Sequence, residues 1–249
     1  MPRSGFLTLL ALLPALAWAE LPAPLEARYE LLRNDKSLGE ASLAYSTDAS
    51  GWRLESRSEG TRGSARLLGF KEHSISQGEW LEGLPRPASF DQVVRAALMD
   101  HGWKADFNWA AERVATQHKD GESSLELSTG ALDPLTLGLR IRTGLARGED
   151  HWTVPFIDRD EIDLDEFATA EEELIDTSLG CLATRRVDKI RPPENKRYTR
   201  TWYARDLGWA PVRIEHGKNG GNRLETRILS LSLDGQPVAS RPPCDSPTG

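Results

Sequence analysis

Polar and apolar residues alternate along most of the chain, and turn-forming residues interrupt the alternation about every eight to twelve residues. Leu25 to Leu31 alternates in this way, and Asn34 and Asp35 then supply a turn. Successive side chains of a strand point to opposite faces, so a period of two is typical of antiparallel strands with one buried face. Short strands at such a regular spacing favour a sandwich or a barrel.

The same pattern predicts strands from one end of the chain to the other. They lie at 25–31, 43–45, 52–56, 75–80, 103–109, 113–119, 124–127, 151–157, 162–167, 172–175, 182–190, 197–203, 212–215 and 224–233. No repeat, low-complexity block or Pro/Ser-rich linker divides these segments. We therefore expect an all-β, mainly antiparallel fold, in which residues 20–235 form a single domain with a barrel-like or sandwich meander and residues 236–249 form a Pro-rich flexible tail.

The segment from Asp133 to Leu145 fits two structures. Asp133 followed by Pro134 is typical of a helix start, because the side-chain oxygen caps the first N–H groups and proline suits the first helical position. The apolar residues between Leu135 and Leu145 fit both the period of a strand and the spacing of a helix. Gly138 and Gly144 disfavour a helix by roughly 1 kcal/mol each. The residues alone leave both structures open.

The first 19 residues have the pattern of a secretory signal peptide. Arg3 provides a basic start, an apolar run extends from Phe6 to Leu16, and Ala17-Trp18-Ala19 is a cleavage signal. The run is too short to cross a bilayer, which takes about 20 residues. Glu20 follows the predicted cut, where a lipoprotein would need a cysteine. We therefore expect an exported, periplasmic protein that does not span the membrane.

The charge balance argues against nucleic acid as a partner. Cleavage after residue 19 would leave 30 basic and 38 acidic residues, a net charge of −8, and such a surface repels phosphate backbones. The basic run from Arg185 to Arg200 is an exception. Apolar and aromatic residues interleave with it, so we interpret it as the solvated face of a strand pair.

Cys181 and Cys244 are the two cysteines of the sequence. In an oxidising compartment an even number favours a disulfide between them. The alternative is two unpaired thiols, because Cys244 lies in a Pro-rich terminal segment. Neither cysteine has a second Cys or a His at the spacing of a metal ligand, so we predict no metal site there.

Several stretches taken together resemble a known family. They are Arg86–Phe90, Ala105–Trp109, Leu132–Thr136 with Arg140, and Thr201–Ile214, and they resemble the exported bacterial proteins grouped as domain-of-unknown-function family 3108. The resemblance implies a strongly curved antiparallel β structure in the envelope of Gram-negative bacteria, with a helix near 133–147. It implies no activity, no cofactor and no catalytic residues. The helix is therefore our prediction for this segment.

The sequence contains none of the motifs that would predict a particular chemistry. It has no serine nucleophile elbow, no phosphate-binding loop and no dinucleotide fingerprint, and its five histidines are scattered. The acidic stretch 158–166 lacks the glycine and the final glutamate of a calcium loop, so we predict a strand there with Ile162 and Leu164 inward and Asp163 and Asp165 in solvent. We predict no catalytic residues and no cofactor, and an enzyme is the less favoured class.

Three hypotheses about function follow. The first is a non-enzymatic module that binds a lipid-like or amphipathic envelope molecule in the concave face of the sheet, with the Asp133–Leu145 segment as its lid. Its candidate lining residues are Trp80, Phe90, Trp103, Phe107, Leu135 and Leu139, although large rings also fill cores. The second is a structural protein that contacts an envelope partner. The third is a cell-wall or polysaccharide hydrolase, for which Asp91, Asp100 and Asp106 are the acids of interest.

Overall fold

The computed structural model describes residues 21–97 and 99–244, so the expected signal peptide at residues 1–19 lies outside the described residues. The described residues form one sheet of 15 strands, two α-helices and a short 3-10 helix. The strands are β1 (Leu25–Arg33), β2 (Lys36–Asp48), β3 (Gly51–Gly60), β4 (Lys71–Leu81), β5 (Leu84–Ala96), β6 (Met99–Asn108), β7 (Arg113–His118), β8 (Gly121–Glu126), β9 (His151–Asp158), β10 (Glu161–Thr177), β11 (Gly180–Ile190), β12 (Arg197–Ala204), β13 (Ala210–Lys218), β14 (Arg223–Leu233) and β15 (Gln236–Pro237). The helices are α1 (Gly63–Leu67), α2 (Pro134–Ala146) and the 3-10 helix η1 (Arg205–Leu207).

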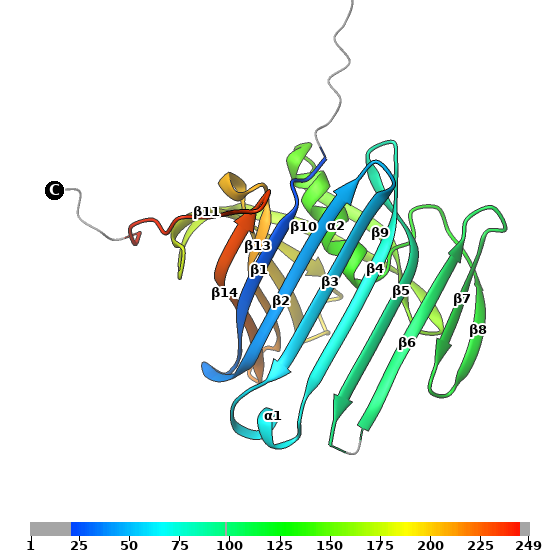
Figure 1. The fold of residues 1–249 in the computed structure, drawn as a ribbon, viewed down its shortest axis with the longest axis horizontal. Coiled ribbons are helices and arrows are strands. Elements are labelled where there is room, and N and C mark those ends of the chain that lie inside the picture. Colours follow the sequence, from blue (N-terminus) through cyan, green and yellow to red (C-terminus); the bar gives the residue numbers. More distant parts are fainter. Residues whose placement is uncertain (1–20, 98, 245–249) are drawn as a thin grey trace, which may run out of the picture.

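The strands pair in one continuous antiparallel path. The path runs from β8 at one edge through β7 down to β1, crosses to β14, and continues through β13 down to β9 at the other edge. β1 therefore joins the two ends of the chain, since it pairs with β2 on one side and with β14 on the other (Figure 1). Among the described strands β8 and β9 remain edges, and the sheet does not close. The predicted fold class, a curved and mainly antiparallel sheet, is confirmed.

Hairpins built from local sequence signals connect these strands. In β1, Leu25, Ala27 and Tyr29 are buried and the residues between them are exposed. Asn34 and Asp35 both adopt positive φ angles, 47° and 63°, in the turn to β2. Such a pair of left-handed residues matches the twist of a two-residue hairpin, and Asn and Asp tolerate it better than most residues do.

Two segments differ from the predicted strands. The sequence analysis places no strand at 84–96, where the structure has β5, because Pro85 and Pro87 interrupt its alternation and lack the N–H donor of a sheet residue. The pairing of β5 with β4 shifts register beside Pro87, because Gln77 pairs with Ser89 and Gly78 with Pro87, so that Ala88 is an extra residue in β5. The strands predicted at 162–167 and 172–175 are one long strand, β10, whose pairing with β11 shifts register between Thr169 and Glu172.

The predicted orientation of two side chains in β10 is wrong. Leu164 is 71% exposed and Asp165 only 8%, the reverse of the expectation that Leu164 points inward. The carboxylate of Asp165 forms an ion pair with the Lys189 ammonium on β11, which compensates for its burial. Hydrophobicity alone assigned the wrong face, because the sequence does not show which charge lies opposite on the neighbouring strand.

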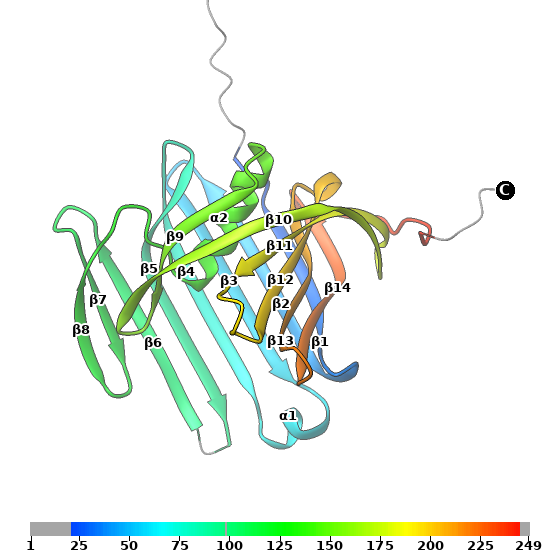
Figure 2. The same ribbon diagram turned by 180° about the vertical axis from the view of Figure 1, so that it is seen from behind.

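α2 lies on the concave side of the sheet, and β9 and β10 cross over it (Figure 2). Asp133 caps the helix, since its Oδ1 accepts hydrogen bonds from the N–H groups of Leu135 (2.9 Å) and Thr136 (3.0 Å), and Pro134 is its first residue. The predicted helix near 133–147 is confirmed. A Cβ at Gly144 would lie 2.4 Å from Nε1 of Trp152 on β9, so glycine permits the close packing of helix and strand.

The C-terminal segment up to residue 244 runs beside β11 and β14. β15 pairs with the end of β14, and the N–H of Cys181 donates to the carbonyl of Pro242 at 2.9 Å. A disulfide joins Cys181 to Cys244 across a sequence separation of 63 residues. These contacts attach most of the segment that the sequence analysis expects to be a flexible tail.

Candidate functional site

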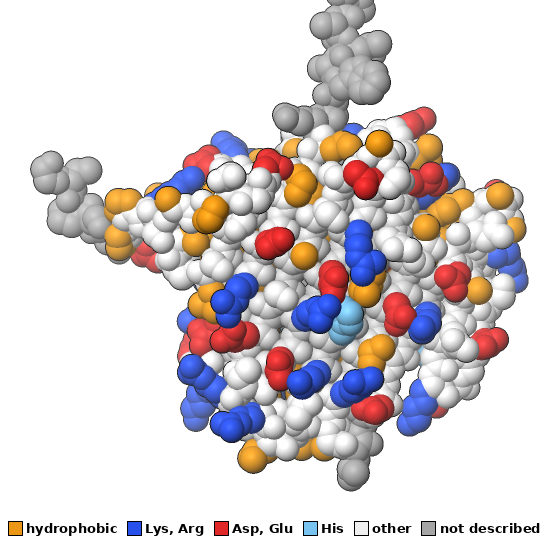
Figure 3. Space-filling model, in the orientation of Figure 1, with side chains coloured by type: hydrophobic (Ala, Val, Ile, Leu, Met, Phe, Trp, Pro, Cys, Tyr) orange, Lys and Arg blue, Asp and Glu red, His pale blue; other side chains and the backbone are white. Residues whose placement is uncertain are grey.

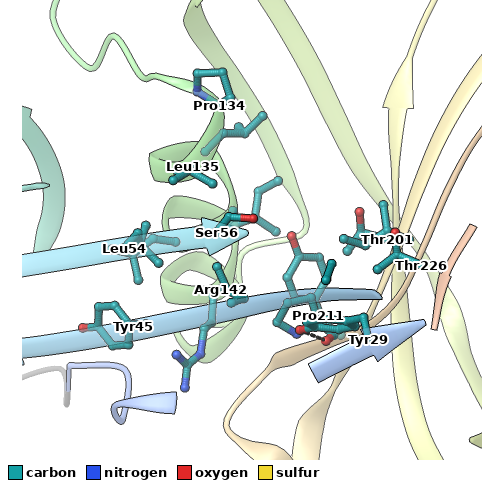
Figure 4. Close-up of a pocket in the computed structure, with 18 of the residues that line it drawn as sticks. Tyr29, Tyr45, Leu54, Ser56, Pro134, Leu135, Arg142, Thr201, Pro211 and Thr226 are labelled. Atoms are coloured by element: carbon teal, nitrogen blue, oxygen red, sulfur yellow. Dashed lines mark hydrogen bonds between the residues drawn. The ribbon is translucent and has the colours of Figure 1, made fainter. Parts of the chain in front are cut away.

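A cavity of about 330 Å³ lies between α2 and the concave face of the sheet (Figure 4). Its walls come from both ends of the chain, because β1, β2 and β3 form one side and β11 to β14 form the other. The helix contributes apolar residues that include Leu135 and Leu139. The cavity is therefore a product of the curvature that brings β11 to β14 round to face the helix.

Side-chain size explains why this part of the concave face is hollow. Tyr29, Tyr45 and Leu54 are large and buried, but they stand beside a set of small residues on the strands. These small residues in the cavity wall are Ala41, Ser42, Ser56, Ser58, Thr199, Thr201 and Thr226. A wall of mainly apolar groups with a few hydroxyls is typical of a small-molecule pocket.

One end of the cavity contains a buried cation, Arg142 on α2, which is only 3% exposed. Its Nε donates to the carbonyl of Gly208 at 2.7 Å and its Nη2 to the carbonyl of Ala23 at 2.9 Å. The guanidinium carbon lies 5.5 Å from the centre of the Tyr45 ring. Burial lowers the pKa of Arg142 to about 10, so the side chain remains charged at neutral pH.

Two tyrosines that line the cavity stay neutral. Burial raises the pKa of Tyr29 and of Tyr203, and the nearby Arg142 charge only partly opposes this. The Tyr29 hydroxyl donates to the carbonyl of Pro211 at 2.9 Å. The rings therefore contribute apolar surface to the wall rather than an ionised phenolate.

The other part of the wall, near the ends of β11, β12 and β13, is polar. Lys189, Thr199 and His216 line the cavity there. Lys189 is paired with Asp165, and the hydroxyl of Thr199 lies 3.2 Å from Nδ1 of His216. The cavity thus has an apolar middle and a polar region where the strands end.

The structure places two of the six candidate lining residues, Leu135 and Leu139, on the cavity wall. Phe90, Trp103 and Phe107 lie in a separate packed cluster on β5 and β6, together with Ile157 of β9. The Phe90 and Trp103 ring centres are 4.6 Å apart. These three rings fill a core rather than line the cavity.

Trp80 on β4 is the sixth candidate, and it too lies outside the cavity wall. It packs half-buried against the main core cluster, and its Nε1 donates to the hydroxyl of Thr47 at 3.0 Å. Conversely, Arg142 lines the cavity but was not among the predicted residues. Arg142 follows Leu135 by seven residues and Leu139 by three, so all three lie on the same face of the helix. This spacing in the sequence could have predicted that Arg142 lines the cavity.

The three acids considered for a hydrolase lie away from the cavity on β5 and β6. Asp91 forms a 2.9 Å ion pair with Lys104, which stands opposite it in the ladder, and Asp106 follows two residues later on the same face. Asp100 is six residues from Asp106 along β6, about 20 Å at the rise of a strand. Within the described part of the chain, no three His, Cys, Asp or Glu side chains are grouped as metal ligands would be.

Comparison with known proteins identifies a family and a fold. The sequence matches the family described as "Protein of unknown function (DUF3108)" over residues 28–225. A search of curated protein sequences finds no match. Neither α2 nor any other helix of the described residues has the length and hydrophobicity that spanning a membrane requires.

Among solved structures, the β-barrel-like protein of domain of unknown function DUF1849 from Brucella abortus is similar with a TM-score of 0.60. The two chains are 10% identical over 86% of this chain and 98% of the other. A candidate lipoprotein from Parabacteroides distasonis matches with a TM-score of 0.34 and 12% identity over 85% and 97% of the chains. A candidate exported protein with a YmcC-like fold from Bacteroides fragilis matches with a TM-score of 0.29 and 11% identity. The match covers 86% of this chain and 96% of the other. The first of these supports the fold, and the other two are too distant to support an argument.

Proposed function

This chain belongs to the DUF3108 family of proteins of unknown function, and we propose that it binds the apolar chain of a lipid-like or amphipathic molecule in the cavity under α2, without converting it. The observation that carries the proposal is the cavity itself, a hollow of about 330 Å³ in an otherwise packed concave face. Apolar walls with few polar groups favour an apolar occupant, because burial of its surface drives binding.

The dimensions of the cavity indicate how much of a ligand it takes. Pockets for small molecules range over about 300–1,000 Å³, and this cavity lies at the lower end of that range. A single unbranched chain fits such a volume better than a molecule with several chains. The ligand is therefore an amphiphile with one chain inserted under α2.

The proposed place of action is the periplasm. The predicted signal peptide at residues 1–19 would export the chain, and the Cys181–Cys244 disulfide suits an oxidising compartment. An amphiphile of the cell envelope would be the available ligand there.

A titration with an uncharged chain tests the proposal. We expect 1-decanol to bind the protein in isothermal titration calorimetry. The variant Ser56→Leu should weaken this binding by roughly tenfold, because the added side chain occupies the cavity wall. The matched control is Ser230→Leu, which makes the same replacement at an exposed residue of β14 and should bind decanol as the unaltered protein does.

Two results would contradict the proposal. One is the absence of decanol binding to the unaltered, folded protein. The other is equal binding to the unaltered protein and to Ser56→Leu, which would place the binding site elsewhere.

A further inference from the structure

A basic groove lies at one end of the cavity, near the ends of β1, β11, β12 and β13. Arg33 at the end of β1, Arg191 after β11, Arg197 at the start of β12 and Lys218 at the end of β13 all line it. We call these four residues the mouth cations. Thr199 and His216 line both this groove and the cavity, so the groove continues the cavity outward.

The strand register places the mouth cations on the same face as the cavity wall. Side chains two residues apart on a strand share a face. Leu31 and His216 line the cavity. Arg33 lies two residues after Leu31, and Lys218 lies two residues after His216. Arg197 stands opposite Lys218 in the ladder, as Thr199 does opposite His216. The concave face therefore changes from apolar to cationic toward the ends of these strands.

The mouth cations lack the carboxylate partners that neighbouring arginines have. Arg223 and Arg227 share Asp35 and Glu225, and Arg186 pairs with Asp188. Within the described residues none of the mouth cations forms an ion pair, and no Asp or Glu lines the groove. On the outer face, by contrast, acidic and basic side chains are interspersed (Figure 3). Several of the Lys and Arg side chains on that face lie along its lower edge in this view.

Arg191 also has a donor without an acceptor. Its Nη2 donates to the hydroxyl of Thr199 at 3.2 Å, which aims the guanidinium toward the shared wall of groove and cavity. Its Nη1 is buried and has no hydrogen-bond partner among the described residues. A buried donor that lacks a partner is costly, so an acceptor at this point would be bound favourably.

We propose that the mouth cations bind the anionic head group of the amphiphile whose chain occupies the cavity, which deepens and rests on the function proposed above. The shared chemistry of the head is a carboxylate or a phosphate, because guanidinium groups bind both with paired, charge-assisted hydrogen bonds. The head lies in the groove and the chain points inward, toward Arg142. At the inner end, Nε and Nη2 of Arg142 donate to the carbonyls of Gly208 and Ala23, and Nη1 is buried without a partner among the described residues. The experiment therefore also includes a variant of Arg142.

The experiment compares decanol, decanoate and decyl phosphate by isothermal titration calorimetry at low ionic strength. We expect both anions to bind roughly tenfold more tightly than decanol, the equivalent of one charge-assisted hydrogen bond. The double variant Arg191→Gln/Arg197→Gln should remove most of the preference for anions, although Arg33 and Lys218 remain in the groove, and should leave decanol binding unchanged. Arg113→Gln on β7, outside the groove and cavity, is the matched control and should retain the preference for anions.

The outcomes separate this inference from the proposed function. If decanol does not bind the unaltered protein, the proposed function fails, and the inference fails with it. If decanol binds but neither anion binds more tightly, or if the double variant keeps the preference, the inference alone is wrong. Another result would also overturn the inference. If Arg142→Lys loses the preference for anions and the double variant keeps it, the head group binds at the end of the cavity next to Arg142. Tight binding of acetate or inorganic phosphate without a chain would overturn it too, in favour of a free anion.

Discussion

The concave face of this sheet is packed over β5 and β6 and hollow over β1, β2 and β3. In the packed part, the rings of Phe90 and Trp103 meet Ile157 of β9, and these three side chains are nearly inaccessible to solvent. In the hollow part, small residues such as Ala41 and Ser56 face α2 across a cavity with a volume of about 330 Å³. Both parts belong to one sheet with the same pleat. The curvature of the sheet encloses both of them, and the size of the side chains then decides which part is hollow.

The largest expected effect tests whether the packed part is purely structural. Trp103→Ala should lower the free energy of unfolding by about 4 kcal/mol, because it leaves a void among close-packed rings. Chemical denaturation measures this loss. Decanol binding by the folded variant should stay unchanged. A variant that folds normally but no longer binds decanol would show that the rings belong to the site, and the contrast between the two parts would fail.

The hollow part should depend on the covalent link between Cys181 and Cys244. The double variant Cys181→Ser/Cys244→Ser should lose about 4 kcal/mol of stability, since the closed loop is long and the chain-entropy argument scales with its length. Thermal unfolding with and without reductant gives the comparison, and the reductant should not affect the double variant. Equal stability of the oxidised and reduced unaltered protein would show that the packed part alone determines the unfolding transition.

Asp133 connects the two parts, because it caps α2 and also accepts a 2.7 Å hydrogen bond from Ser76 of β4. Asp133→Ala should lower the free energy of unfolding by about 2 kcal/mol, because the helix loses its cap. The buried hydroxyl of Ser76 also loses its acceptor. Ser76→Ala removes one donor and should cost about 1 kcal/mol. Denaturant titration of both variants checks the order. A larger loss for Ser76→Ala than for Asp133→Ala would contradict this account of how the helix is held over the cavity.

The smallest effect is expected for Ala41→Leu, which is compared with the same replacement in the packed part. Ala105→Leu, in the packed part, should cost about 2 kcal/mol because its neighbours must shift. Ala41→Leu, on the cavity wall, should change stability by less than about 0.5 kcal/mol, since space for the added side chain exists. Denaturant titration compares the two. Equal costs at both positions would mean that the hollow collapses or is filled in solution.

The alternation of the sequence predicted most of the strands and their antiparallel arrangement, because a half-buried strand carries its own local pattern. It missed β5, whose prolines interrupt the alternation, and it divided β10 in two. Asp133 and Pro134 likewise signalled the start of α2, and Leu135 and Leu139 were assigned to the cavity wall. Phe90, Trp103 and Phe107 were assigned to the same wall because their inward face was predictable. What those rings meet was not predictable, since Ile157 reaches them from the opposite edge of the sheet.

The wrong orientation of Leu164 and Asp165 has the same origin. A strand pattern gives two faces, but whether a buried carboxylate is tolerated depends on a cation on the neighbouring strand, here Lys189. The grouping of the mouth cations was missed for a related reason. Arg191 and Arg197 were noted only as part of a basic run that we interpreted as the solvated face of a strand pair. Arg33 is far in sequence from Arg191 and Arg197, and the curved sheet brings their strands to one groove.

The amino-acid sequence by itself determined the all-β class and the family, because period and local motifs involve residues close together in the chain. The capping signal at Asp133 left strand and helix open, and the family resemblance favoured the helix. Only the tertiary structure decided which stretch of the concave face is hollow, which end of it is cationic and which rings are core. These properties depend on the residues that meet across the curved sheet, and such pairs are separated by a hundred residues or more of sequence in contacts such as Tyr29 with Pro211.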